Sequence, residues 1–119
     1  MFGRRRRDER AWRTWGELTT QRRAPGQMVG QVSHVYQHAK RGSKAIVDFG
    51  PGLGRLDTWW PGSRPKLGQW VLVRAHRWTP PGTHSGTYVW WIDGVDGIWP
   101  ADLRTRAERF AKRRVAGRT

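Results

Sequence analysis

The sequence predicts an all-β core, a small antiparallel barrel of five to six strands, with a short helix before it and a basic helix after it. In the middle of the chain, short runs rich in β-branched and aromatic residues alternate with turns rich in glycine and proline, a spacing typical of small closed barrels. At the C-terminus, the apolar residues instead recur at helical spacing. The length of 119 residues suits one domain with terminal extensions.

The chain divides into three parts: a basic N-terminal arm with a short helix (1–26), the β-barrel (27–100) and a basic C-terminal helix (101–119). In the arm, residues 8–18 predict an amphipathic helix interrupted near Gly16. Its apolar residues lie at helical spacing: Ala11, Trp12, Trp15 and Leu18. The four arginines before it repel one another, so we expect residues 1–7 to be mobile in the isolated chain and to become ordered against a partner.

Strand-like runs fill the barrel region: 28–36, 43–49, 53–60, 69–78 and 87–93, with a short edge strand at 94–100. A polar turn is expected at 37–42, and two longer loops at 61–68 and 79–86 are bounded by proline and glycine. The glycine-rich stretch 50–54 has the composition of a phosphate-binding loop. A strand follows it instead of the start of a helix, so we interpret it as a turn.

The C-terminal segment 101–117 is the clearest helix of the sequence. Its apolar stripe consists of four residues: Leu103, Ala107, Phe110 and Ala111. Asp102 favours the positive start of the helix, and Gly117 is a suitable stop. We expect the stripe to pack on the barrel or on a neighbouring subunit, while the basic residues around it remain available for a partner.

The net charge of +14 is concentrated at the two ends of the chain. Residues 1–26 carry eight arginines against three acidic residues, and residues 101–119 carry seven basic residues against two acidic ones, which gives +5 at each end. Such ends attract a polyanion or an acidic protein surface. A solvated basic tail that only aids solubility is the alternative.

The sequence shows no pattern that indicates catalysis, a metal site or a cofactor. There is no cysteine, so disulfides and thiolate ligands are excluded. His34 and His38 would not converge on a strand, and His76 and His84 add no third ligand at a suitable spacing. The aspartates of the barrel are not paired with histidine and serine at a recognisable spacing. No run approaches the roughly 18 apolar residues of a membrane span, and we expect no enzyme and no membrane contact.

The nine tryptophans are the strongest functional signal, and seven lie in the barrel region: Trp59, Trp60, Trp70, Trp78, Trp90, Trp91 and Trp99. Each indole buries roughly 200 Å², which is too much for a small barrel to enclose seven times. Because side chains alternate along a strand, Trp59 and Trp60 face opposite sides of the sheet, and so do Trp90 and Trp91. We expect one member of each pair outside the core, covered by the terminal helices, by stacked bases or by another subunit.

Residues 28–93 resemble a barrel of the oligonucleotide/oligosaccharide-binding (OB) type, through "GQMVGQVSHV" at the first strand and "KLGQWVLVRA" at the fourth. The order of "VGQV", "VDF", "GPGLG", "TWWP" and "GQWVLV" is similar, more particularly, to the barrel of phage tail-tip and baseplate proteins. This resemblance implies a minor tail or connector protein. The preference for arginine, glycine, proline and tryptophan, which have GC-rich codons, indicates a phage of an actinobacterium.

The function predicted from these observations is that of a structural virion protein of a phage tail, located in the virion. It would assemble as a ring or other homo-oligomer, or with virion proteins that have acidic faces. The residues assigned to partner contacts are Trp59, Trp60, Trp90, Trp91, Arg4, Arg5, Arg6, Arg7, Arg109, Arg113 and Arg114. The alternative is a single-stranded nucleic-acid-binding protein of the bacterial cytoplasm, in which the same tryptophans stack on bases and the same arginines follow phosphates.

Overall fold

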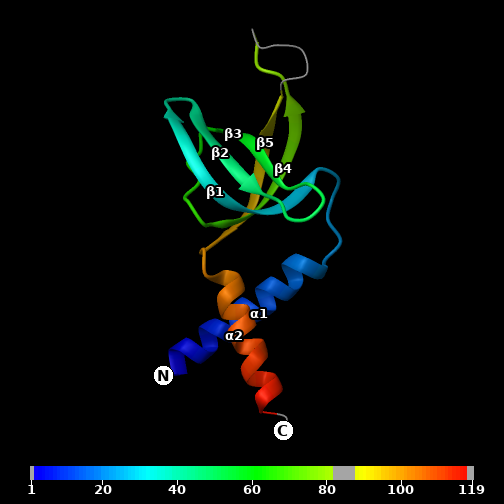
Figure 1. Ribbon diagram of the computed structural model, residues 1–119, viewed down its shortest axis with the longest axis vertical. Coiled ribbons are helices and arrows are strands. Elements are labelled where there is room, and N and C mark those ends of the chain that lie inside the picture. The colour runs from blue at the N-terminus through cyan, green and yellow to red at the C-terminus, as the bar shows by residue number, and fades with distance from the viewer. Residues whose placement is uncertain (1, 82–87, 118–119) are drawn as a thin grey trace. The chain divides into compact units, whose positions relative to one another are not determined.

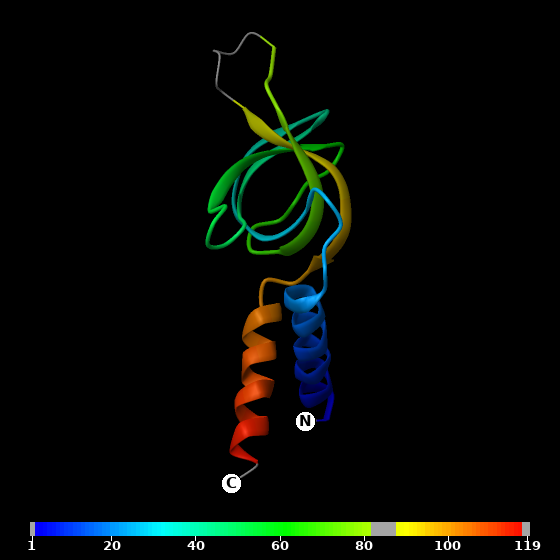
Figure 2. The same ribbon diagram turned by 90° about the vertical axis from the view of Figure 1, so that its right-hand side faces the viewer.

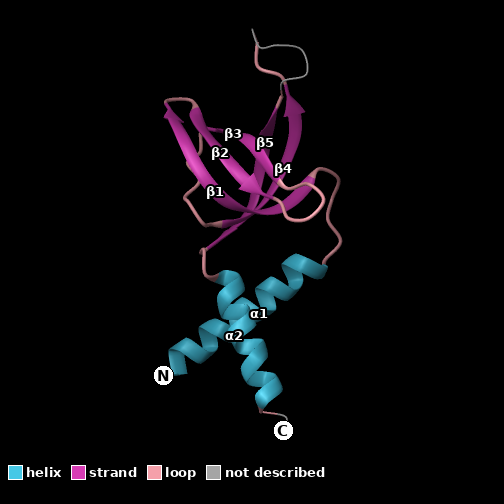
Figure 3. Ribbon diagram, in the orientation of Figure 1, coloured by secondary structure: helices cyan, strands magenta, loops and turns pink. Residues whose placement is uncertain are grey.

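The computed structural model describes residues 2–81 and 88–117, which form two compact units (Figures 1 and 3). Arg23–Trp99 form the barrel unit. Met1–Arg22 and Pro100–Thr119 together form the second unit, which contains both helices and is called the helical unit below. The two ends of the chain thus belong to one folded unit.

Five strands form a closed barrel: β1 (Gln27–Ala39), β2 (Gly42–Asp48), β3 (Arg55–Pro61), β4 (Trp70–Trp78) and β5 (Val89–Trp99). Their order around the barrel is β1-β2-β3-β5-β4, and β4 pairs again with β1 (Figure 2). The β3–β5 pair is parallel, with Thr58 beside Trp90 and Trp59 beside Trp91, and the other neighbours are antiparallel. The predicted β-barrel with a helix at either end is confirmed.

The barrel interior is filled by alternate residues of its strands: Val32, Ala45, Val47, Phe49, Trp60, Val71, Val73, Ala75 and Ile92. Gly30 allows β1 and β2 to approach each other closely. A Cβ atom at this position would lie 2.6 Å from a Val47 methyl group and 2.7 Å from the Phe49 ring, both far inside van der Waals contact. The small residue is therefore required by the packing of this core.

Several predicted strand bounds were wrong. β1 continues to Ala39 because residues 37–39 still pair with β2, while the polar side chains of Gln37 and His38 are exposed. The expected edge strand at 94–100 is instead the second half of β5, which remains paired with β4 through two register shifts. The turn at 50–54 is confirmed, with positive φ at each of its three glycines. Part of the predicted loop at 79–86 lies outside the described residues.

The helical unit consists of α1 (Phe2–Thr20) and α2 (Leu103–Ala116), which cross each other in Figure 1 and lie side by side in Figure 2. The predicted stripe of α2 meets α1. Leu103 and Ala107 are buried, and the Phe110 ring lies 5.2 Å from the Trp12 ring between centroids. Ala11 and Leu18 are the buried apolar residues of α1. Each helix thus covers the apolar side of the other.

The predicted helix at 8–18 was too short at both ends and has no interruption. Arginine is a good helix former, and α1 begins at Phe2, so the four consecutive arginines are helical. Gly16 lies within the helix, where its carbonyl accepts hydrogen bonds from the hydroxyls of Thr20 (2.6 Å) and Thr19 (3.3 Å). The structure describes 2–7 as the first turns of a helix that packs on α2.

Candidate partner-binding surfaces

The first adjacent pair of tryptophans divides between the two faces of β3. Trp60 is a core residue, 1% exposed, and its indole N–H donates to the hydroxyl of Thr58 at 2.7 Å. That hydroxyl in turn donates to the carbonyl of Ala45 at 2.6 Å. The assignment of Trp60 to a partner contact is therefore corrected, and Trp59 is the member of this pair on the outer face.

The second pair divides in the same way on β5. Trp90 packs against the core cluster, with the guanidinium of Arg77 at 5.6 Å from its ring centroid. Its indole N–H is buried and has no hydrogen-bond partner within the described residues. Trp91 instead lies among other rings, 6.3 Å from Trp59 and 4.7 Å from Trp78 between centroids. Trp90 is an inner residue, and Trp91 is the outer one.

Trp59, Trp78 and Trp91 form one aromatic surface on the outside of three strands, which we call the tryptophan patch. Lys44 of β2 pairs with Trp59, Trp59 pairs with Trp91, and Trp91 pairs with His76 of β4. The row thus crosses four neighbouring strands. All three indoles are partly exposed. Trp78 was not among the residues predicted to contact a partner, because its place beside Trp91 depends on the register of β4 with β5.

The acidic side chains next to the tryptophan patch already have partners. Asp57 accepts a hydrogen bond of 2.5 Å from the phenol of Tyr36, and Asp93 lies 2.7 Å from Nδ1 of His76. Burial, followed by the hydrogen bond and charge of Asp57, raises the pKa of Tyr36 well above its ordinary value. Both aspartates next to the patch are thus held by a hydrogen bond from a neighbouring ring side chain.

The His76–Asp93 pair was missed in the sequence, since the two residues meet only through the register of β4 and β5. An aspartate can fix the tautomer and orientation of a histidine in a catalytic triad. No hydroxyl or thiol side chain hydrogen-bonds His76 within the described residues, so the pair lacks a nucleophile there. It is a hydrogen-bonded pair on the outer face of the barrel.

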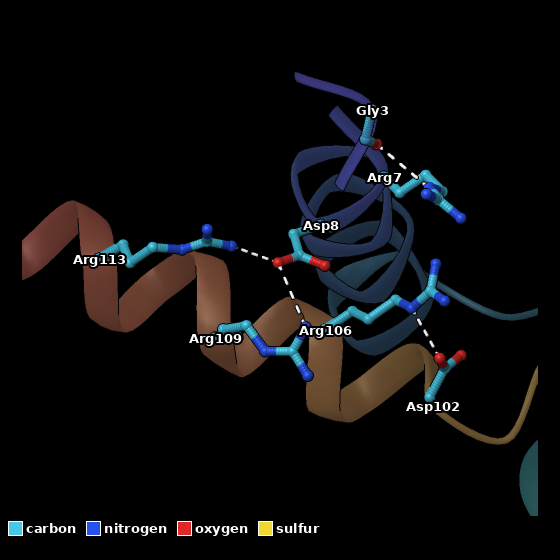
Figure 4. A network of polar contacts seen from close by, with 7 residues as sticks. All are labelled: Gly3, Arg7, Asp8, Asp102, Arg106, Arg109 and Arg113. Carbon is cyan, nitrogen blue, oxygen red and sulfur yellow. Dashed lines mark hydrogen bonds and ion pairs between the residues drawn. The ribbon is translucent and has the colours of Figure 1, made fainter. Parts of the chain in front are cut away.

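The arginines assigned to partners lie in the helical unit and fall into two groups. Arg4, Arg5, Arg6 and Arg7 are exposed in the first turns of α1. Arg109 and Arg113 of α2 instead meet Asp8 of α1, which is 1% exposed (Figure 4).

The contacts around Asp8 involve one of its oxygens. Arg113 donates to Oδ2 of Asp8, and the Arg109 guanidinium lies 3.6 Å from the same oxygen. Arg114 covers the Trp12 ring at 4.9 Å. These three arginines therefore already have contacts within the helical unit, and their assignment to partner contacts stays a prediction.

Two further properties concern the described residues only. They contain no group of three or more histidine, cysteine or acidic residues that could hold a metal ion, and His84 lies outside them. None of the helices seen in 2–81 and 88–117 has the length and apolar character needed to cross a membrane.

No protein-family model matches this chain, and no curated protein matches its sequence. The chemistry of the two surfaces is therefore the guide to function: an aromatic patch flanked by two hydrogen-bonded aspartates on the barrel, and a dense set of arginines on the helical unit.

Proposed function

We propose that this protein is a structural assembly component whose barrel binds another protein subunit through the tryptophan patch. The observation that carries the proposal is the contact of Trp59 and Trp78 with Trp91 on the outer face of the closed barrel. Tryptophan is the residue type most enriched among those that dominate protein–protein binding energies. A rigid aromatic centre with a polar rim is also the usual anatomy of such interfaces.

The charges around the tryptophan patch favour a protein over a nucleic acid. Binding to a phosphate backbone depends on unpaired lysines and arginines. Lys44 is the residue of the row that has no ion pair within the described part of the chain, while Asp57 and Asp93 flank the same rings. The indoles also contact one another at 54° and 71°, so their faces are partly occupied by neighbouring rings.

In the finer form of the proposal, the protein is a minor tail, tail-tip or connector component of a phage virion. The sequence resemblance of residues 28–93 to tail-tip and baseplate barrels supports this assignment, as does the closed five-stranded barrel. Copies of a chain with a charge of +14 repel one another. We therefore expect the partner to be a different virion protein, with an apolar pocket that receives the tryptophan patch.

Co-purification with the products of the flanking genes tests this proposal. The wild type is expected to retain one of these proteins, while Trp91→Ala should lose it, at a cost of roughly 2 kcal/mol or more of binding free energy. Leu67→Ala is a matched control, because Leu67 is 69% exposed and lies outside the tryptophan patch. Retention of the same protein by Trp91→Ala would contradict the proposal.

Light scattering and oligonucleotide binding complete the test. If light scattering shows a ring made of this chain alone, and Trp91→Ala does not form it, the partner at the tryptophan patch is a second copy of this chain and not a different protein. Single-stranded DNA that binds in high salt, and that is released on loss of Trp59 or Trp91, would show instead that the tryptophan patch stacks on bases.

A further inference from the structure

The helical unit contains a pocket whose chemistry differs from that of the tryptophan patch. Its volume is about 280 Å³, and both helices contribute to its lining: Arg4, Arg7, Asp8, Asp102, Arg106 and Arg109. Figure 4 shows Arg109 and Arg113 of α2 joined to the buried Asp8, and Arg7 of α1 joined to Gly3. Four guanidinium groups therefore face two carboxylates, which leaves a net charge of +2.

Asp8 organises one side of this pocket. It is buried, and its Oδ2 receives Arg113 and lies near Arg109, both from α2. Its second oxygen, Oδ1, is also buried and has no hydrogen-bond partner within the described residues. The carboxylate thus holds two arginines of the opposite helix in place while its own charge stays shielded from solvent.

The other guanidinium groups of the pocket differ in how many of their N–H donors are still available to an anion. Arg106 is held by Asp102, with its Nε 2.6 Å from a carboxylate oxygen. Arg7 donates from Nε to the carbonyl of Gly3 at 3.2 Å, so its two terminal nitrogens remain. Neither Arg4 nor Arg7 makes an ion pair within the described residues, and both are exposed.

We propose that this pocket binds phosphate groups of a nucleic-acid backbone. Arg4 and Arg7 supply the unpaired guanidinium groups, and Arg109 is held beside them by Asp8. Guanidinium groups bind phosphate through paired, charge-assisted hydrogen bonds.

A second group of arginines lies on another face of α1, centred about 100° or more around the helix from Arg4 and Arg7. Arg6, Arg10 and Arg13 line this second depression together with Glu9, which pairs with Arg13 at 3.1 Å. Successive turns of a helix are about 5.4 Å apart, so α1 presents a linear array of positive charge. A linear array suits a linear polyanion better than a single anion or a folded acidic surface.

The site is tested by the salt dependence of oligonucleotide binding for two double variants of equal charge. Arg4→Gln/Arg7→Gln removes the two unpaired arginines of the pocket. Arg55→Gln/Arg64→Gln is the control, because both residues are exposed on the barrel unit and have no ion pair within the described part of the chain. All proteins are titrated with a fluorescent 20-nucleotide duplex and with a single strand of the same length.

The pocket variant is expected to bind the preferred oligonucleotide about tenfold more weakly. The slope of log K against log salt should fall by up to about 2, because each phosphate contact contributes roughly 0.9 on duplex DNA. The control should change the affinity less than twofold. Equal losses in both double variants would show that only the net charge acts, and would overturn the proposal.

Asp8→Asn distinguishes a specific phosphate site from a general effect of net charge, because the two predict opposite changes in affinity for the polyanion. Removing a negative charge strengthens polyanion binding if only the net charge matters. If Asp8 positions Arg109, the same change weakens binding, which is the result we expect. The helix content of the variant is checked by circular dichroism, and the Arg4/Arg7 pair remains decisive if Asp8→Asn unfolds the helical unit.

Competitors identify the source of the bound anion. Unlabelled oligonucleotide should displace the probe at a far lower concentration of negative charge than two competitors do: inorganic phosphate, and polyglutamate of the same length as the oligonucleotide. If polyglutamate competes equally well, the surface binds acidic protein and the nucleic-acid proposal fails. Arg4→Gln/Arg7→Gln should still retain the protein partner of the tryptophan patch, so failure at this site is distinguishable from failure of the proposed assembly function.

Discussion

Trp78 and Trp91 meet edge to face, with their ring centroids 4.7 Å apart and their planes at 71°. This arrangement is favoured by the ring quadrupoles and contributes about 0.5–1.5 kcal/mol beyond the buried area. Trp91 also contacts Trp59, so it is the central ring of the tryptophan patch. The contact joins β4 to β5 on the outer face of the barrel.

Trp91→Ala is expected to destabilise the barrel by about 2–4 kcal/mol, more than Trp59→Ala or Trp78→Ala, because it removes two ring contacts instead of one. Urea unfolding of the three variants measures this order. Double-mutant cycles provide the control: Trp91 should couple to each of the other two rings, while Trp59 and Trp78 should be nearly additive. A strong coupling between Trp59 and Trp78 would contradict the geometry.

Thr58→Val is expected to lower the free energy of unfolding by about 1–3 kcal/mol, because it leaves the buried indole N–H of Trp60 without its acceptor. Thr58→Ser keeps the hydroxyl and serves as the matched control, with a smaller loss that reflects one methyl group. Chemical denaturation of both variants gives the comparison. Equal losses would show that the hydroxyl contributes nothing.

Gly30→Ala and Gly16→Ala are expected to have opposite effects. At Gly30 an added Cβ would lie 2.9 Å from the carbonyl oxygen of Asp48 as well as close to two core side chains, so we expect a loss of about 2 kcal/mol. At Gly16 nothing lies within 4 Å of the added atom, and the higher helix propensity of alanine should stabilise α1 by up to about 1 kcal/mol. Thermal unfolding of the two variants checks both signs.

The Tyr36–Asp57 hydrogen bond predicts a loss of stability in alkali. Because the pKa of Tyr36 is raised in the folded state, the folded protein retains a proton that the unfolded chain releases near pH 10. The contribution of this group to the free energy of unfolding is therefore complete below about pH 10 and decreases as the pH rises above it. Urea midpoints between pH 7 and 11 should decline more steeply for wild type than for Tyr36→Phe. Parallel curves would disprove the coupling.

The sequence allowed the barrel, the turn at 50–54 and the alternation of the two tryptophan pairs to be predicted, because each depends on local patterning. The stripe of α2 was also recognised, but its packing partner α1 was not, since no local pattern specifies which apolar surface a helix meets. In the sequence, Asp8 is an acidic residue beside a run of arginines, a pattern that does not indicate burial. Its burial follows from the approach of Arg109 and Arg113, which lie about a hundred positions away in the chain.

The His76–Asp93 pair and the membership of Trp78 in the tryptophan patch were missed for a related reason. Both depend on the register between β4 and β5, which contains two shifts, and a shift of one residue moves every side chain to the other face of a strand. Strand runs can be recognised from composition. Bulges that set the register leave little trace in a single sequence.

The parallel contact between β3 and β5 is the seam at which the barrel closes, since these strands are separated by all of β4 in the chain. Trp59 and Trp91 face each other across this seam, so their juxtaposition exists only in a chain whose barrel has shut. Any molecule that binds both indoles therefore binds the closed state and not the open one. At a free concentration one hundred times its Kd, such a molecule would stabilise the closed barrel by about 2.7 kcal/mol relative to the open chain. It would therefore bind completed barrels and not unfinished ones.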